Sequence, residues 1–113
     1  MYEFHGDKRY YFDMTHKVTV GHILPFIKEQ FQFPNNMRVL EIGCGEAGVL
    51  KAFTDLGYKC TGIELEESRL EFAREFMKDE LESGQIQFLN KDIYDVNPEV
   101  DLGTKFDLII IIF

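Results

Sequence analysis

The stretch VLEIGCGEAGVL, residues 39–50, combines one glutamate with three glycines. Gly43, Gly45 and Gly48 follow the pattern G-x-G-x-x-G, and Glu41 stands two residues before the first of them. Glycine permits unusual backbone angles and lets a ligand approach the main chain closely. Between a strand and a helix, such a loop lies at the ligand-binding edge of a parallel sheet. The stretch therefore predicts a binding site for a small ligand.

Two further acidic residues are spaced to suit a nucleoside. Glu64 follows Gly43 by about 20 residues, where a carboxylate can accept hydrogen bonds from a ribose diol. Asp92 follows a predicted third strand, where it can accept a hydrogen bond from an adenine amino group, and Ile93 can pack on the adenine face. The alternatives are a solvated strand end for Glu64 and an ordinary turn residue for Asp92.

Glu41 discriminates between ligands that contain a nucleoside. A pyrophosphate beside this carboxylate would be electrostatically unfavourable, whereas an ammonium or sulfonium group would be favoured. S-adenosylmethionine has both cations, a ribose for Glu64 and a carboxylate for the N-terminus of the next helix. The alternative is a structural Glu41 that accepts hydrogen bonds from the backbone N–H groups of the loop.

The elements around these residues alternate between strands and helices, which predicts parallel strands with helical crossovers. We expect strands at 38–42, 58–65, 86–89 and 106–113, and helices at 47–56 and 67–81. A polar connection at 95–104 leads to the last strand. That strand, FDLIIIIF, is typical of one buried on both faces of a parallel sheet.

The amino-terminal part is less regular. We expect an extended arm over 8–14 and then a helix, capped by Asp13 or Thr15 and kinked near Pro25. The predicted fold class is α/β: a Rossmann-like three-layer αβα arrangement with an incomplete parallel sheet of about four strands, preceded by an amino-terminal helix. Residues 1–36 form the arm and helix, which cover the cofactor or pack on the domain. Residues 37–113 form the first half of a cofactor-binding domain.

The amino-acid composition disfavours some classes of binding partner. The 113 residues carry a net charge of −8, which disfavours nucleic acids and anionic membranes. Cys44 and Cys60 lack metal-ligand spacing and indicate free thiols in a reducing cytoplasm. The three histidines show no metal-ligand spacing either, so no metal is expected.

Four segments in order resemble motifs of the class I S-adenosylmethionine-dependent methyltransferases, the seven-stranded Rossmann-like family. Residues 39–50 resemble the first motif, 62–75 the second, 86–96 the third and 105–113 the fourth strand. The resemblance covers 39–113. It implies a methyltransferase that binds S-adenosylmethionine and acts on a small-molecule or protein acceptor.

The resemblance also implies roles for individual residues. Gly43, Cys44 and Gly45 would contact the methionine part through their backbone, with Cys44 a small apolar filler. Glu64 would bind the ribose. The adenine would lie beside Leu65, Asp92 and Ile93. Gly48 stands where the family pattern often has a third glycine.

Only about half of that family's usual domain is present, because its fifth to seventh strands have no counterpart here. We expect a truncated chain that is not competent alone, and the catalytic residues stay unknown. A homodimer through the apolar strand at 106–113 would cover its edge. Two other readings remain open: an NAD-dependent Rossmann oxidoreductase fragment, and a non-catalytic nucleotide-binding or interaction module.

The aromatic residues of the amino-terminal arm carry a separate hypothesis. Tyr10, Tyr11 and Phe12 would form part of a lid over the sulfonium, whose charge suits aromatic faces. The alternative is that they pack against the following helix.

Overall fold

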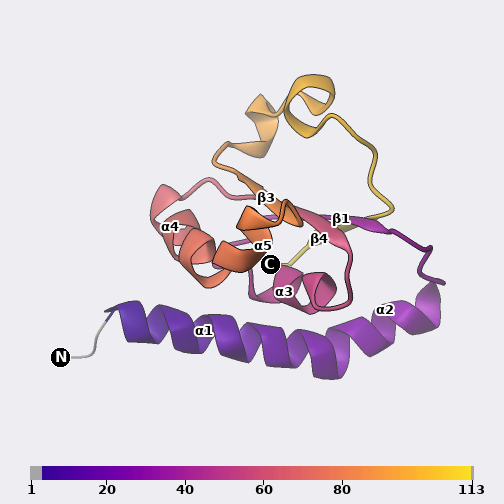
Figure 1. Cartoon of the computed structure of the whole chain (residues 1–113), viewed down its shortest axis with the longest axis horizontal. Helices are drawn as coiled ribbons and strands as arrows, with labels where there is room; N and C mark the ends of the chain where they lie inside the picture. The colour runs from indigo at the N-terminus through magenta and orange to yellow at the C-terminus, as the bar shows by residue number, and fades with distance from the viewer. Residues whose placement is uncertain (1–3, 113) are drawn as a thin grey trace.

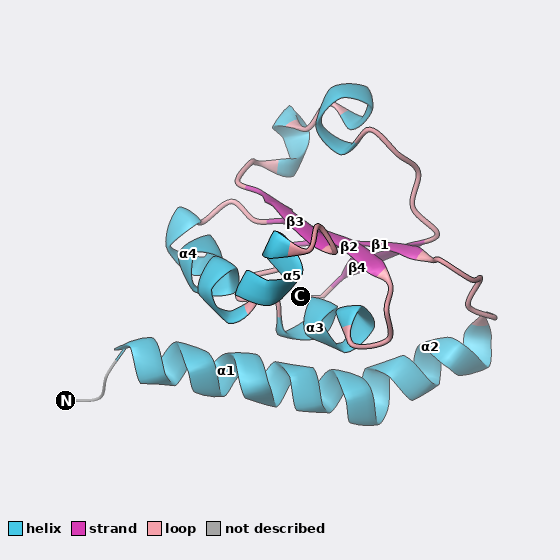
Figure 2. Cartoon of the chain, viewed as in Figure 1, coloured by secondary structure: helices cyan, strands magenta, loops and turns pink. Residues whose placement is uncertain are grey.

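The computed structural model describes residues 4–112, and four parallel strands form its centre (Figures 1 and 2). The strand order is β3-β2-β1-β4, so β1 and β2 are central. The strands are β1 (Arg38–Ile42), β2 (Lys59–Ile63), β3 (Ile86–Leu89) and β4 (Leu108–Ile111). The predicted parallel α/β sheet is therefore confirmed, and β1 and β3 have the predicted bounds.

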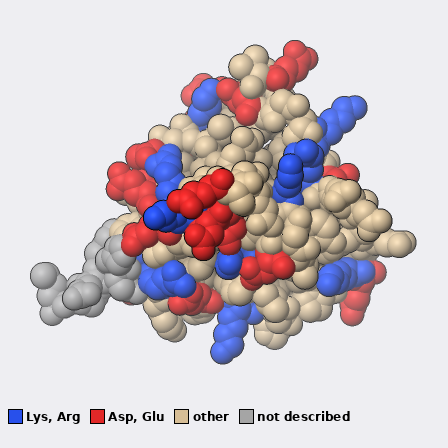
Figure 3. Space-filling view, in the orientation of Figure 1, with Lys and Arg blue, Asp and Glu red and all other residues tan. Residues whose placement is uncertain are grey.

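Helices cover one face of the sheet, and two short helical turns stand on the opposite side (Figure 1). The first group contains α1 (Phe4–Val18), α2 (Leu24–Gln30), α3 (Gly48–Thr54), α4 (Glu67–Phe76) and α5 (Lys78–Glu82). The turns are η2 (Ile93–Asp95) and η3 (Pro98–Leu102), which lie in the connection from β3 to β4. Acidic and basic side chains are interspersed over the face shown in Figure 3.

Residues 8–14 belong to helix α1, so their predicted extended conformation is wrong. Helix α1 begins at Phe4, and neither Asp13 nor Thr15 caps it. Thr15 instead donates a hydrogen bond from its hydroxyl to the Tyr11 carbonyl, one turn back. Phe12 is buried and packs against Phe76 with ring centroids 5.1 Å apart, so tertiary packing stabilises the helix.

The predicted kink near Pro25 is confirmed as a π-helical turn, η1 (Thr19–Ile23). Proline has no N–H and clashes with the carbonyl four residues earlier, so the α-helical hydrogen-bond ladder cannot continue through it. The N–H of Leu24 donates to the Thr19 carbonyl, five residues back. Helix α2 then resumes with Pro25 in its first turn, where no N–H is needed.

The helix predicted at 67–81 is two helices. It breaks at Met77, whose φ of −110° and ψ of 29° lie outside the helical region. The Met77 side chain is fully buried, and α5 begins after the break and contacts β3.

Strand β4 is only half covered, so its predicted burial on both faces is wrong. Ile110 points into the core and is 8% exposed, whereas Ile109 and Ile111 on the other face are 56% and 50% exposed. The local sequence is apolar throughout, but β4 forms an edge of the sheet. Among the described residues, the turns η2 and η3 stand on that side of the sheet next to β3, at the edge opposite β4 (Figure 1).

Gly48 brings α1 and α3 into close contact. A Cβ atom at Gly48 would lie 2.7 Å from the Phe12 carbonyl oxygen and 2.7 Å from the Thr15 Cβ. The first residue of α3 must therefore be glycine for α1 to lie across it.

Replacing this glycine tests the packing of α1. Gly48→Ala should lower the free energy of unfolding by about 1–3 kcal/mol, because the methyl group overpacks the helix contact. Urea unfolding measures the change. Gly21→Ala is the control, since a Cβ there meets nothing within 4 Å. Equal unfolding midpoints for Gly48→Ala and the wild type would contradict the close contact.

Candidate functional site

The glycine loop follows β1. Three of its backbone N–H groups donate hydrogen bonds to other groups of the protein. The amides of Gly43 and Cys44 donate to the Ile63 carbonyl at 2.8 and 3.1 Å. The amide of Gly45 donates to Glu64 Oε1 at 2.8 Å. These three donors are therefore not available to cradle an anion such as a phosphate.

Glu41 lies at the floor of the loop with an unpaired oxygen. Its side chain is 3% exposed, and Oε1 accepts no hydrogen bond from the described residues. Burial, and then the charge of Glu64, raise the pKa of Glu41 to about 8, while the Arg69 cation opposes the shift. The alternative that Glu41 bonds the backbone of the loop is wrong. Glu64 has that role.

Glu64 is buried at the end of β2 rather than solvated. It accepts from the Gly45 amide through Oε1 and from the Glu66 amide through Oε2, the latter at 3.1 Å. Carboxylate oxygens can each accept more than one hydrogen bond. The side chain therefore shapes the loop and keeps acceptor capacity for a diol.

Glu46, Arg69 and Lys8 form an ion-pair cluster that the sequence analysis missed. Arg69 donates from Nε and Nη2 to the two oxygens of Glu46 at 2.9 and 3.0 Å. Lys8 of α1 donates to Glu46 Oε2 at 3.1 Å. Glu46 is 4% exposed, and its hydrogen bonds to these cations hold its pKa below the ordinary value despite burial. The sequence signal was an acidic residue inside the glycine loop, together with Arg69 in the first turns of α4.

A cavity of about 330 Å³ opens beside the loop and beneath α1. Four predicted site residues line it: Glu41, Gly43, Cys44 and Gly48. The remaining walls come from the loop, the helices and the residue after β4, namely Tyr11, Phe12, Thr15, Glu46, Val49, Arg69 and Ile112.

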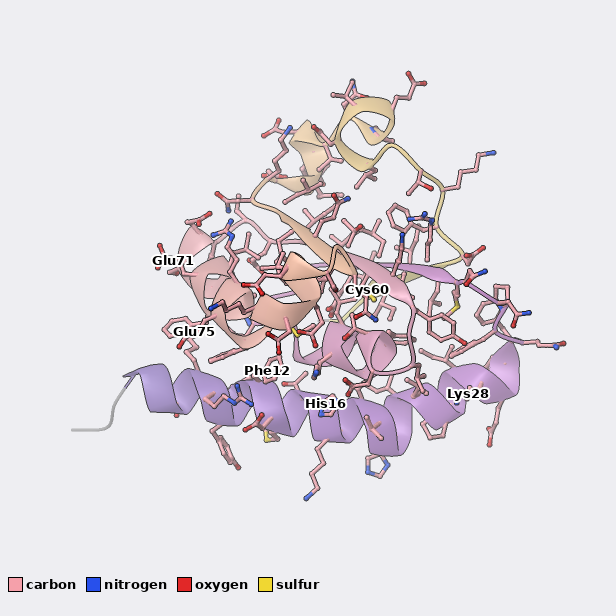
Figure 4. The ribbon with its side chains drawn as sticks, viewed as in Figure 1. Phe12, His16, Lys28, Cys60, Glu71 and Glu75 are labelled. Atoms are coloured by element: carbon pink, nitrogen blue, oxygen red, sulfur yellow. The ribbon has the colours of Figure 1, made fainter. Side chains whose placement is uncertain are left out.

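The aromatic residues Tyr10, Tyr11 and Phe12 of α1 differ in their surroundings. Tyr11 is half exposed and lines the cavity, as a lid residue would. Phe12 also lines it but is buried and packs against Phe76 of α4 (Figure 4), a different helix from the following one that the packing alternative named. Tyr10 does not line this cavity. It is 64% exposed and borders a separate surface hollow with Met14.

The residues predicted for adenine lie outside the cavity, beyond Glu64. Leu65 and Ile93 are exposed, which suits apolar groups that would flank a planar ring. Asn90 donates from Nδ2 to the carbonyls of Glu64 and Leu65, and so ties the segment after β3 to the end of β2. Asp92 accepts from the Tyr94 amide through Oδ1 and caps η2.

The two cysteines are free and buried. Burial raises the pKa of both thiols, so neither is prepared as a nucleophile. A Cβ at Gly62 would lie 2.6 Å from Cys44 Sγ, which fits Cys44 as a small filler. Within residues 4–112, no cluster of three or more His, Cys, Asp or Glu side chains could hold a metal ion.

Two further findings concern the rest of the described chain. A second hollow, of about 380 Å³, lies at the amino ends of the strands, where Arg38 and Lys59 line it. Apart from Cys60, it contains no residue that the sequence analysis named. Over residues 4–112, every helix is too short or too polar to cross a lipid bilayer.

The pKa of Glu41 predicts how stability depends on pH. In the unfolded chain Glu41 ionises near its ordinary pKa of 4.5, whereas in the folded protein it stays protonated up to about 8. The wild type should therefore lose stability relative to Glu41→Gln as the pH rises through this window, by several kcal/mol at its upper end. Urea unfolding at several pH values measures the difference. Glu64, Arg69 and the two thiols are present in both proteins. A difference that is constant from pH 4.5 to 8 would contradict the buried neutral carboxyl.

Comparison with known protein families identifies one family, and comparison with solved structures identifies similar folds. A family model described as a methyltransferase domain matches residues 39–113. No curated protein sequence matches the chain. Among solved structures, DesVI from Streptomyces venezuelae aligns with a TM-score of 0.71 at 23% identity, over 100% of this chain and 44% of DesVI.

Two further solved structures carry a ligand. Magnesium protoporphyrin IX methyltransferase from Synechocystis, with bound S-adenosylmethionine, aligns with a TM-score of 0.64 at 18% identity, over 98% of this chain and 49% of that one. The glycopeptide N-methyltransferase MtfA, complexed with S-adenosyl-L-methionine, gives 0.63 at 20% identity, over 82% and 39%. The chain therefore spans less than half the length of these structures.

Proposed function

Since this chain belongs to the methyltransferase-domain family, we propose that it carries the S-adenosylmethionine-binding portion of a methyltransferase. The Glu41 carboxyl supports this most directly. Its Oε1 is buried and has no partner among the described residues, and Glu41 is one of the residues that line the cavity. A ligand cation at this point would satisfy the oxygen and favour its ionised form.

The glycine loop supports the same ligand. Because the amides of Gly43, Cys44 and Gly45 donate within the protein, the loop can offer chiefly acceptors to a ligand. Acceptors suit the ammonium group of a sulfonium amino acid and do not suit a pyrophosphate. This observation disfavours the NAD-dependent alternative. The methyltransferase-domain match disfavours the alternative of a non-catalytic nucleotide-binding or interaction module.

Each of the other predicted residues would contact a different part of S-adenosylmethionine. Glu64 would accept the ribose hydroxyls. Leu65 and Ile93 would flank the adenine. Asp92 uses Oδ1 for the Tyr94 amide, and its Oδ2 would accept from the adenine amino group. Tyr11 would lie over the sulfonium from α1, where its aromatic face favours a positive charge.

Bound S-adenosylmethionine would supply an activated methyl group for in-line displacement. The described residues bind and orient the ligand and exclude water from it, which is the main requirement of such a transfer. Two of the similar structures are named for methylation of a glycopeptide and of magnesium protoporphyrin IX. A small-molecule acceptor is therefore our preference over a protein acceptor. The buried free thiols fit a reducing cytoplasm.

Calorimetric titration of the protein with three ligands tests the proposal. S-adenosylmethionine and S-adenosylhomocysteine should bind, and NAD should not, because NAD places a pyrophosphate near Glu41. Binding of NAD alone would contradict the proposed function.

Glu64→Gln tests the ribose assignment. The amide keeps one oxygen acceptor for the Gly45 amide but loses the charge, so S-adenosylmethionine binding should weaken by about 1–3 kcal/mol. Glu67→Gln, at the exposed start of α4, is the matched control and should bind as the wild type does. Thermal unfolding confirms that both variants fold. An unchanged dissociation constant for Glu64→Gln would remove Glu64 from the ribose site.

The uncovered edge of strand β4 leads us to expect that the protein forms a dimer. Its outer edge and its half-exposed Ile109 and Ile111 would be covered if a second copy paired through residues 106–113. Sedimentation equilibrium should then detect a dimer, and Ile111→Lys should reduce it to a monomer. A wild-type protein that stays monomeric at all concentrations would contradict this assembly.

A further inference from the structure

The ion pair between Glu46 and Arg69 lies next to Gly45 and Glu64, the residues at the proposed ribose end of the site. Arg69 contacts Glu46 with both arms of a fork, and Glu46 belongs to the glycine loop itself. The same guanidinium reaches toward Glu64, with Nη1 4.0 Å from Oε1. The Arg69 cation therefore lies near both the Glu46 carboxylate of the loop and the Glu64 carboxylate, which follows β2.

Gly45 is held between these charges. Its amide donates to Glu64, and its φ of +55° is one that residues with side chains rarely adopt. A Cβ at this position would overlap the Arg69 guanidinium, because the Arg69 Cζ atom would lie 2.8 Å from it. The guanidinium thus lies close against the backbone of the loop at Gly45.

The pair also balances the charge of the site. Glu41, Glu46 and Glu64 are all buried. Arg69 pairs with Glu46, approaches Glu64 and lowers the pKa of Glu41. Lys8 is the second cation on Glu46 and joins the cluster to α1, which roofs the cavity.

Resting on the proposed function, we propose that Arg69 and Glu46 are positioning residues that hold Gly45 and Glu64 in the geometry that receives the ribose of S-adenosylmethionine. Arg69 acts through the loop and through the neighbouring carboxylates. It is not a catalytic residue. The forked contact makes arginine, rather than lysine, the suitable cation, because only a guanidinium binds both oxygens of Glu46 in one plane.

The test separates positioning from folding with a paired substitution. Removing Arg69 alone leaves a buried carboxylate with one fewer partner and endangers the fold, whereas exchanging both charges for apolar groups is often tolerated. The main variant is therefore Arg69→Met combined with Glu46→Met. Arg69→Lys keeps the charge without the fork. Arg74→Met, on the same helix but paired with exposed Glu67, is the control.

The measurements are thermal unfolding and calorimetric titration with S-adenosylmethionine across pH. The double variant should fold, yet bind roughly tenfold more weakly, as expected for the loss of about one charge-assisted hydrogen bond. Arg69→Lys should bind with intermediate affinity. Because Arg69 no longer lowers the pKa of Glu41, the affinity of the double variant should level off at a higher pH than in the wild type. Glu64, Cys44 and Cys60 are the other titratable groups near Glu41, and they are common to both proteins.

The outcomes are distinct. A folded double variant with the affinity and pH profile of the wild type would overturn the positioning role. If the double variant does not fold, Arg69→Lys decides, and wild-type binding by that variant would overturn the role of the fork. Failure of the wild type to bind S-adenosylmethionine would instead contradict the proposed function.

Discussion

Three carboxylates are buried around one glycine loop, and the site depends on how each charge is compensated. Glu64 accepts two backbone N–H groups, Glu46 pairs with two cations, and Glu41 has an oxygen without a partner among the described residues. A buried charge is costly unless it is paired or neutralised by a proton. The first two carboxylates therefore stabilise the loop. The third is held neutral by its raised pKa and has one oxygen without a partner among the described residues.

This arrangement joins the amino-terminal helix to the site. Helix α1 crosses α3 at Gly48, where no side chain separates them, and Lys8 extends from it to Glu46 in the loop. Phe12 fills the space between α1 and α4, as Figure 4 shows. The same helix thus packs on the domain and contributes residues to the wall of the cavity.

Sequence periodicity was sufficient where local pattern determines structure and insufficient where distant contacts do. The short apolar runs of β1 and β3 have the predicted bounds. Helix α1 was missed because tertiary packing of Phe12 stabilises it, and the outer face of β4 was misjudged because burial depends on which elements cover an edge. The Glu46–Arg69 pair joins residues 23 positions apart, so only the folded βαβ unit reveals it.

The central claim is that the buried Glu41 carboxyl receives the cationic end of S-adenosylmethionine. Its most direct test is the number of protons released on binding, from calorimetry in buffers with different ionisation enthalpies. At a pH well below 8 the free carboxyl is protonated, so binding should release close to one proton in the wild type and none in Glu41→Gln. Binding without proton release, or equal release from both proteins, would contradict the claim.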